Sequence, residues 1–334
     1  MSQTAETFSG PTFRLVDTMD WQEVVQLGGF GPRTAPLLVK GAVLAWPAFE
    51  RWTFEKLAAL RKPDGSEVVF RFQNGLVEQG VTRPPLDLAI SPYIEGLARA
   101  SAQSTVSQES SNRGLLPYSI WEEMQPGKLF HGRPFHLNWS HMNSFTADQV
   151  YLAQWNILEE FPAMRKDFEI RKLWPGWRWT WEFVFIGPAN TVTGLHYDFP
   201  NNWFCQVHGT KEVILFPPDQ TPSMSKSLKY DWGATLSDVN ISNLDARPIE
   251  KEKFAKAHGI YARVESGDAL FIPRRTWHAV VSLEPSISLG VFGLTPSEIV
   301  LGGAPSEARH LLHKLRLYRW NNCTCHRMSP ANLE

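Results

Sequence analysis

Cysteine, long apolar runs and an excess of charge of either sign are all missing from this chain. Its 334 residues include only three cysteines, which excludes a disulfide scaffold and favours a reducing compartment. No apolar run approaches the roughly 18 residues of a membrane-spanning helix. The polar stretch at residues 1–11 contains no secretory signal. We therefore expect a cytoplasmic protein without a membrane anchor.

The balance of charge narrows the expected partners. The formal net charge is −1, from 33 basic and 34 acidic residues. Such a chain lacks the positive field that attracts nucleic acids and anionic lipids. We expect a peptide, protein or small-molecule partner, and neither nucleic acid nor a membrane.

Half of a zinc-site pattern lies near the C-terminus, at Cys323, Cys325 and His326. A structural zinc site needs four ligands, commonly two such pairs. No second pair of Cys or His lies nearby at ligand spacing, so zinc is the weaker interpretation of this cluster.

The chain is predicted to consist of four segments. They are a disordered tail at residues 1–11, N-terminal α/β elements packed on a core at 12–150, a β core at 151–300, and a C-terminal helical segment at 301–334.

Short patterns of both kinds occupy the N-terminal part. Residues 36–42 form an apolar strand pattern that ends in Gly, and residues 67–72 alternate like a second strand. Residues 54–60 predict a helix with Thr53 as its N-cap. The Ser-rich residues 101–115 predict an exposed loop.

Short β patterns separated by Pro, Gly, Asn and Asp dominate from Trp179 onward. The clearest are residues 181–186, 203–207, 212–216, 262–264, 269–272 and 287–292. Regularly punctuated short strands are typical of a barrel or sandwich. Beyond them, Ser306 to Trp320 carries leucines at helical spacing and predicts one amphipathic helix.

Three residues of this β region have the chemistry of a metal site. Side chains at i and i+2 of a strand share a face, so His196 and Asp198 can point into one cavity. His278 follows the turn-and-strand pattern Gly267–Pro273 and offers a second imidazole. Two histidines and one carboxylate form the facial triad of non-haem Fe(II) oxygenases.

A His-X-Asp pair alone is more often a satisfied hydrogen bond than a pair of metal ligands. The metal interpretation is favoured by the joint pattern: His196 and Asp198, then Lys211, then His278 directly after a Gly-Asp-X-Leu-Phe-Ile-Pro run.

On these residues the chain resembles a known family. Residues 193–220 and 263–292 are similar to the JmjC (cupin-like) family of Fe(II)- and 2-oxoglutarate-dependent oxygenases. Residues 202–220 are especially similar to the subgroup of the asparaginyl hydroxylase that modifies hypoxia-inducible factor. The resemblance implies a mainly β chain with flanking helices, built on a double-stranded β-helix (jelly roll). It also implies Fe(II), 2-oxoglutarate and O₂ in the hydroxylation of an unactivated C–H bond.

The resemblance assigns a cosubstrate pocket as well. Lys211 matches the family lysine that binds the distal carboxylate of 2-oxoglutarate, and a buried lysine does need an anion. Thr193 and Tyr151 match residues at that same end. Asn202 matches an asparagine near the metal-bound end. The plainer alternatives are a solvated strand lysine for Lys211 and turn or cap roles for Thr193 and Asn202.

The substrate side carries weaker signals. Trp177, Trp179 and Trp181 alternate, so we expect them on one face of a strand, either as core or as an aromatic wall for an extended peptide or a flat apolar substrate. Trp174 belongs to the same cluster. Phe292 stands where the subgroup has a second asparagine, which weakens transfer of that subgroup's substrate.

Two arginines, Arg274 and Arg275, lie beside the metal histidine and could steer an acidic group, although exposed loop arginines are usually just solvated. Of the two, Arg275 is the predicted substrate-binding residue.

Several functions fit these features. Hydroxylation of a protein or peptide side chain is the first hypothesis, and hydroxylation of a small metabolite or natural-product intermediate is the second. An N-methyl-lysine demethylase is less favoured, because no reader module is seen. A non-catalytic cupin-like binding protein is disfavoured by the intact ligand set. Relatives in the subgroup dimerise through C-terminal helices, so we expect a homodimer through the 306–320 helix.

Overall fold

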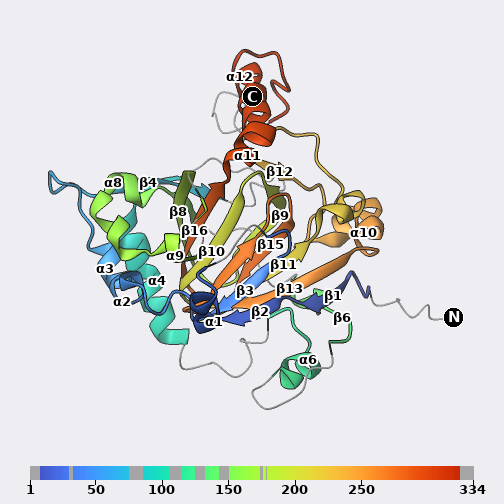
Figure 1. Cartoon of the computed structure of the whole chain (residues 1–334), viewed down its shortest axis with the longest axis horizontal. Coiled ribbons are helices and arrows are strands. Elements are labelled where there is room, and N and C mark those ends of the chain that lie inside the picture. The colour runs from blue at the N-terminus through green and yellow to red at the C-terminus, as the bar shows by residue number, and fades with distance from the viewer. Residues whose placement is uncertain are drawn as a thin grey trace.

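Two facing β-sheets form the body of the chain in a computed structural model (Figure 1). The structure describes residues 8–29, 33–74, 86–104, 114–124, 132–142, 150–173, 176–177 and 179–323. Among these residues, no helix has the length and apolar character needed to cross a membrane.

The first sheet has seven strands in the order β12-β9-β15-β11-β13-β1-β6. Their bounds are β12 (Ala234–Leu236), β9 (Val192–Asp198), β15 (Trp277–Ser282), β11 (Lys211–Phe216), β13 (His258–Val264), β1 (Thr12–Leu15) and β6 (Phe135–His136).

The second sheet has nine strands in the order β2-β3-β14-β10-β16-β8-β7-β4-β5. Their bounds are β2 (Asp17–Asp20), β3 (Leu37–Lys40), β14 (Ala269–Ile272), β10 (Asn201–His208), β16 (Ser286–Leu294), β8 (Trp179–Gly187), β7 (Val150–Trp155), β4 (Val69–Asn74) and β5 (Leu86–Ala89).

Helices and turns complete the chain. They are α1 (Trp21–Gln26), α2 (Pro47–Arg51), α3 (Phe54–Ala58), α4 (Ile90–Ser104), α6 (Tyr118–Glu123), α7 (Trp139–Met142), α8 (Ile157–Glu160), α9 (Ile170–Leu173), α10 (Pro248–Phe254), α11 (Pro296–Glu298) and α12 (Ala304–Lys314), with 3₁₀ turns at Pro162–Asp167, Pro218–Met224 and Leu244–Ala246 and a π turn at Ile299–Gly303. The helices α2, α3, α4 and α8 gather on one side of the molecule, and α12 projects from the body near α11 and β12 (Figure 1).

Alternation along the strands creates three separate apolar layers. Val213 and Leu215 of β11 face Phe204 and Leu270 of the other sheet, and these side chains fill the space between the sheets. The outer face of the nine-stranded sheet packs against the helices, with Trp203 at its centre. The outer face of the seven-stranded sheet packs against residues 115–120, residues 135–142 and α10. This is the mainly β jelly-roll fold that the sequence predicted, so the fold prediction is confirmed.

The N-terminal strands extend both sheets. β1 pairs in parallel with β13 of the seven-stranded sheet. β3 pairs with β14 of the nine-stranded sheet. The part of the chain predicted as N-terminal α/β elements is therefore continuous with the core by hydrogen bonding.

Some local predictions hold and others shift. The helix α3 begins after Thr53, whose hydroxyl accepts a hydrogen bond from the Lys56 amide at 3.3 Å, as predicted. The strand predicted at 67–72 is β4, two residues later. Residues 105–113 of the predicted Ser-rich loop and residues 1–7 of the predicted tail lie outside the described residues.

The C-terminal helix is shorter than predicted. α12 ends at Lys314, whereas the leucine spacing predicted a helix to Trp320. Arg316 adopts a left-handed φ of 64°, and the Leu317 amide donates to the Leu312 carbonyl at 2.8 Å. This pattern is a Schellman-type end, which turns the chain back despite the absence of Gly.

Candidate metal centre

His196, Asp198 and His278, named here the triad, meet on two neighbouring strands. The Cα atoms of His196 on β9 and His278 on β15 are direct cross-strand partners. Such partners have their side chains on the same face of the sheet. Asp198 is two residues beyond His196 at the end of β9, and its carbonyl accepts a hydrogen bond from the Arg275 amide at 3.0 Å. The turn before β15 is thus fixed to the end of β9.

The potential ligand atoms converge. His196 Nε2 lies 3.9 Å from one Asp198 carboxylate oxygen, and His278 Nε2 lies 3.5 Å from the other. The two imidazole rings are 4.3 Å apart between centroids, at 52° to one another. One ligand atom from each residue lies within 4.8 Å of the other two.

The backbone determines which histidine nitrogens are free. His196 Nδ1 lies 2.8 Å from the Gly194 carbonyl, and His278 Nδ1 lies 3.0 Å from the Thr276 carbonyl. A carbonyl accepts only, so each Nδ1 carries the proton and each Nε2 keeps a lone pair. Burial lowers the pKa of His278 to about 3, and the nearby His196 acts in the same direction. Both rings therefore present a lone pair to the same point.

The carboxylate of the triad lacks enough positive charge around it. Burial raises the pKa of Asp198, and Asp231 raises it further, while His196 opposes both. Asp231 follows no recognisable strand pattern, so nothing in the sequence placed it near Asp198. A cation between the three side chains would offset this cost, because an opposite charge favours the ionised carboxylate.

A divalent cation fits this set of donors. Two ligand atoms at roughly 2.1 Å from an ion and at right angles lie about 3 Å apart, slightly closer than the observed separations of 3.5 and 3.9 Å. Small side-chain adjustments cover this difference. Two neutral imidazoles and one carboxylate occupy three positions around an ion and leave others open.

Lys211 is a buried cation deeper between the sheets. Its side chain is on the same face of β11 as Val213 and Leu215, and the residue is only 1% exposed. Its Nζ donates to the Tyr151 hydroxyl at 3.2 Å, and the rings of Tyr151 and Phe204 lie 5.5 Å away. Burial lowers the pKa of Lys211 to about 7. No carboxylate of the described residues lies within ion-pair distance of this amine, so the site lacks an anion.

The other predicted cosubstrate residues line the same interior. Thr193 on β9 is paired with Val280, whose side chain lies in the interior layer. Asn202 on β10 is two residues from Phe204 on the same face, and it is 5% exposed. Its side-chain oxygen is buried without a hydrogen-bond partner. A buried acceptor of this kind is costly unless a ligand or water satisfies it.

Comparison with known proteins agrees with the fold. The model of the cupin-like domain family matches residues 29–292, which is most of the chain. The chain belongs to the cupin-like domain family.

Several curated relatives match part of this cupin-like chain. It is 31% identical over 155 residues to "Jumonji C domain-containing protein 5" of Drosophila melanogaster, covering 42% of this chain and 35% of that protein. It is 30% identical over 137 residues to "tRNA wybutosine-synthesizing protein 5" of Gallus gallus, covering 41% of each. It is 24% identical over 255 residues to "HSPB1-associated protein 1" of Bos taurus, covering 75% of this chain and 46% of that protein. The match thus spans less than half the length of each of these relatives. A resemblance to JmjC proteins is shown, but the narrower asparaginyl hydroxylase subgroup is not.

Aromatic residues form one wall of this cupin-like interior. Phe292 on β16 is paired with Asn202 on one side and with Trp181 of β8 on the other. The Phe292 ring contacts Phe183 edge-on, with centroids 5.9 Å apart. Phe292 therefore lies beside Asn202 on the neighbouring strand. Phe183 was not predicted, although its position two residues after Trp181 could have indicated it.

The tryptophans do not all share one face as predicted. Trp177 precedes β8 and is buried in the helix-covered layer, where its ring lies against Gly293. Trp179 and Trp181 are 52% and 46% exposed. The alternation fails because Trp177 lies outside the strand. Trp174 lies outside the described residues.

The two arginines beside the triad differ in position. Arg275 has a left-handed φ of 60° and an exposed side chain, and only its amide is engaged, by the Asp198 carbonyl. Arg274 is the more buried residue, with its side chain 22% exposed. Sequence reasoning selected Arg275, whereas it is the Arg274 guanidinium that lies against the ring of Phe199, the residue after Asp198, at 4.8 Å from the ring centre.

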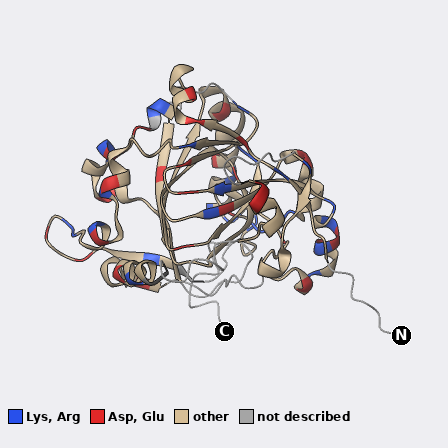
Figure 2. Ribbon diagram, turned by 90° about the horizontal axis from the view of Figure 1, so that it is seen from below, with Lys and Arg blue, Asp and Glu red and all other residues tan. Residues whose placement is uncertain are grey.

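The remaining sequence signals lie away from the triad. Cys323 is buried beside Tyr230, and Cys325 and His326 lie outside the described residues. Basic and acidic residues are interspersed over the ribbon without separating into two faces (Figure 2).

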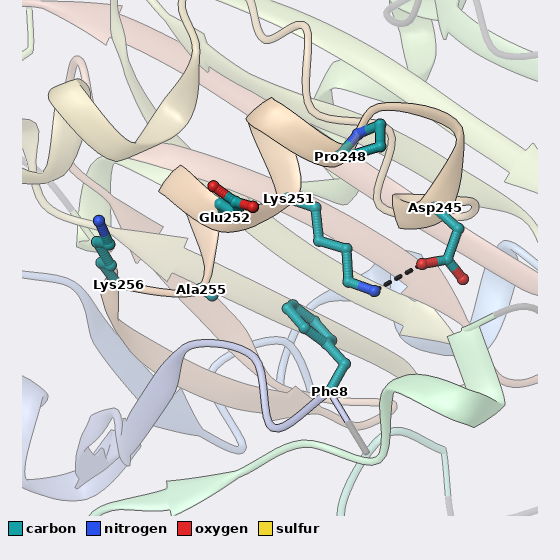
Figure 3. A pocket seen from close by; sticks show the side chains of 7 residues that line it. All are labelled: Phe8, Asp245, Pro248, Lys251, Glu252, Ala255 and Lys256. Atoms are coloured by element: carbon teal, nitrogen blue, oxygen red, sulfur yellow. Dashed lines mark hydrogen bonds and ion pairs between the residues drawn. The ribbon is translucent and has the colours of Figure 1, made fainter. Parts of the chain in front are cut away.

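A surface hollow of about 550 Å³ lies between Phe8 and α10 (Figure 3). Its cation Lys251 is already bound to Asp245 at 2.6 Å and stacked over Phe8 at 4.6 Å. The triad is not among its lining residues.

Proposed function

We propose that this cupin-like chain is an Fe(II)- and 2-oxoglutarate-dependent oxygenase that hydroxylates an unactivated C–H bond. One observation carries the proposal. The triad and the buried amine of Lys211 lie on the interior side of the same sheet, and Lys211 is four residues along β11 from Leu215, the cross-strand partner of His278. A bound metal and a dicarboxylate would satisfy both at once.

In this proposal His196, Asp198 and His278 hold the iron through Nε2, a carboxylate oxygen and Nε2. When bound, the iron supplies the oxidising chemistry, in which 2-oxoglutarate and O₂ give succinate, CO₂ and the hydroxylated substrate. The carbonyls of Gly194 and Thr276 orient the two imidazoles, as hydrogen-bond partners behind metal ligands commonly do.

The chain's remaining interior residues position the cosubstrate. Lys211 binds the distal carboxylate through its ammonium form, and the Tyr151 hydroxyl lies at 3.2 Å from that amine to assist. Thr193 faces the same space from β9. The unpartnered oxygen of Asn202 lies beside Phe292, toward the metal end. No general acid or base is needed for this division of roles, because these residues orient the reactants and exclude water.

A protein or peptide side chain is our first candidate substrate, and a small metabolite is the second. The relatives' names point to different tasks, since one concerns wybutosine synthesis in tRNA and another association with HSPB1. The substrate must therefore be inferred from the residues that line the interior of this chain. Phe292 makes that interior apolar at a position where the asparaginyl hydroxylases have an amide. This difference argues against the same substrate.

Succinate release tests the proposal. The purified chain, supplied with Fe(II), 2-oxoglutarate and air, should form succinate even without added substrate, and chelation of the iron should stop it. Asp198→Ala should lower this rate by at least about 100-fold, since loss of even an outer partner of a metal site costs 10- to 100-fold. Asp238→Ala, at an exposed aspartate that pairs with Arg247 at 3.7 Å, is the matched control and should keep the rate. Equal rates in the two variants would contradict the proposal.

We also propose that the chain forms a homodimer through α12. Leu311, Leu312 and Leu315 are 58%, 41% and 57% exposed on or just beyond this projecting helix. Exposed apolar clusters on a projecting element commonly mark an interface. Light scattering should give twice the mass of one chain, and Leu311→Glu with Leu315→Glu should return it to the monomer mass. A monomer in the unsubstituted protein would rule the dimer out.

A further inference from the structure

Arg274 lies in the turn between β14 and β15, against Phe199, the residue that follows the triad's Asp198. It follows by two residues Ile272, whose side chain belongs to the layer between the sheets. Its amide donates to the side-chain oxygen of Asn201 at 3.0 Å, and the amide of the next residue donates to the carbonyl of Asp198. This peptide segment is thus fixed to the start of β10 and to the end of β9, the strand that carries His196 and Asp198.

The guanidinium of Arg274 is enclosed but makes few polar contacts. It lies 4.8 Å from the centre of the Phe199 ring and close to Gly302, where a Cβ atom would meet it. No described residue accepts a hydrogen bond from its five N–H groups, and burial lowers its pKa. A guanidinium in this situation gains from a planar anion that can accept two parallel hydrogen bonds.

Its one acidic neighbour is already occupied. Glu298 lies 4.0 Å from Arg274, at the limit of an ion pair. The same carboxylate accepts hydrogen bonds from Asn201 Nδ2 at 3.0 and 3.1 Å, and from the amide and hydroxyl of Thr295 at 2.8 and 2.9 Å. Glu298 is therefore committed to the start of α11, and the donors of Arg274 remain available.

A row of mostly apolar side chains crosses the interior side of the nine-stranded sheet and ends at Ile272, two residues before Arg274. Trp181, Phe292, Asn202 and Ile272 are successive partners across four adjacent strands. Three strand spacings amount to roughly 14 Å, which is the backbone separation of Trp181 and Ile272, and Arg274 follows two residues later. Trp181 is 46% exposed, which leaves its ring accessible to a ligand.

We propose that the substrate of this site carries a carboxylate bound by Arg274, joined to an apolar or aromatic group that lies against Trp181 and Phe292. This inference rests on the proposed function, and it supplies the substrate class that the proposed function leaves open. The carboxylate can belong to a free acid or to an acidic side chain of a peptide. A methylated ammonium group would be repelled by Arg274, so the inference disfavours lysine demethylation.

Matched acid and amide probes test the inference directly. The free probes are indole-3-acetate and 4-phenylbutyrate, each beside its amide. The peptide probes are acetyl-Asp-Leu-Phe-amide beside acetyl-Asn-Leu-Phe-amide. Binding is measured by titration calorimetry on the full chain loaded with Mn(II) and 2-oxoglutarate, which cannot turn over, and again on the metal-free chain.

We expect at least one acid to bind about tenfold more tightly than its amide, the size of one charge-assisted contact. Arg274→Gln should reduce that preference to within twofold without weakening the amide, and Arg274→Lys should restore part of it. Trp181→Ala should weaken acid and amide alike. Arg71→Gln is the matched control and should keep the full preference, because Arg71 is an exposed arginine of β4 that pairs with Asp87 of β5. The preference of free acids over peptides, or the reverse, identifies the source of the carboxylate.

Two results would overturn the inference. One is an unsubstituted chain that binds none of the acids more tightly than its amide. The other is an Arg274→Gln variant that retains the preference. Cosubstrate binding by Arg274→Gln keeps this test separate from that of the oxygenase proposal, because this variant should bind 2-oxoglutarate normally. A chain that binds acids selectively but releases no succinate would leave the carboxylate site standing and contradict only the oxygenase.

Discussion

Lys211 and Glu212 are consecutive residues of β11, both buried and both ionisable, yet the protein treats them differently. Glu212 faces outward and is held by its own chain. Its carboxylate accepts hydrogen bonds from the Tyr261 hydroxyl and the Leu115 amide, each at 2.6 Å, and Arg263 lies 3.9 Å away. Lys211 faces the space between the sheets, where the Tyr151 hydroxyl is its hydrogen-bond partner among the described residues. Glu212, whose carboxylate has its hydrogen bonds, fixes the segment at Leu115 to the sheet. Lys211, whose amine lacks a counter-charge among the described residues, is suited to bind a ligand.

The largest expected effect concerns the affinity for 2-oxoglutarate. Lys211→Met should weaken cosubstrate binding by about 100-fold, because the distal carboxylate loses charge-assisted hydrogen bonds in a buried site. The same variant should have a free energy of unfolding about 1–4 kcal/mol higher without ligand, since methionine removes the cost of a buried ammonium. Calorimetric titration and denaturant unfolding measure the two quantities. A Lys211→Met variant that loses stability and keeps its affinity for 2-oxoglutarate would contradict this difference between Lys211 and Glu212.

Glu212→Ala should show the opposite behaviour. Removing this carboxylate leaves the Tyr261 hydroxyl and the Leu115 amide buried without an acceptor, which should lower the free energy of unfolding by about 3 kcal/mol. Affinity for 2-oxoglutarate, measured on the folded fraction at low temperature, should stay within twofold. A large loss of affinity at full stability would show that Glu212 belongs to the pocket after all.

Cosubstrate binding should depend on pH through Lys211. Burial lowers the pKa of the free protein's amine to about 7, and a bound carboxylate raises it again. Above pH 7 binding must therefore take up a proton, and affinity should fall about tenfold per pH unit. Without ligand, the unfolded chain holds more protons than the folded chain between about pH 7 and 10.5, so stability should rise with pH in that range. Titrations in buffers of different ionisation enthalpy detect the proton, and Lys211→Met should take up none.

The smallest effect is expected from Tyr151, whose hydroxyl accepts a hydrogen bond from the amine. Tyr151→Phe removes a single neutral hydroxyl, so affinity for 2-oxoglutarate should fall only about three- to fivefold. The apolar contact of this ring with Phe185, at 6.5 Å between centroids, should remain. A loss as large as that of Lys211→Met would mean that the hydroxyl, and not the amine, is the main anion donor.

Much of this arrangement could be predicted because it follows strand periodicity. The spacing of His196 and Asp198 predicts a shared face, and the run before His278 predicts a turn that returns a second imidazole. What the sequence could not provide depends on single backbone conformations. Arg275 adopts a left-handed φ of 60°, and Arg316 adopts one of 64° at the end of α12. Asp231 reaches Asp198 only through tertiary packing.

Anaerobic titration of the chain with Fe(II) and 2-oxoglutarate tests the central claim most directly. A chelate of ferrous iron and a 2-oxo acid has a visible charge-transfer absorption. We predict this absorption for the unsubstituted chain at a low concentration of 2-oxoglutarate. Lys211→Met should show it only at a much higher concentration, and Asp198→Ala should not show it at any concentration. An unsubstituted chain without the absorption, or one matched by both variants, would contradict the account of a metal and a dicarboxylate held between these two sheets.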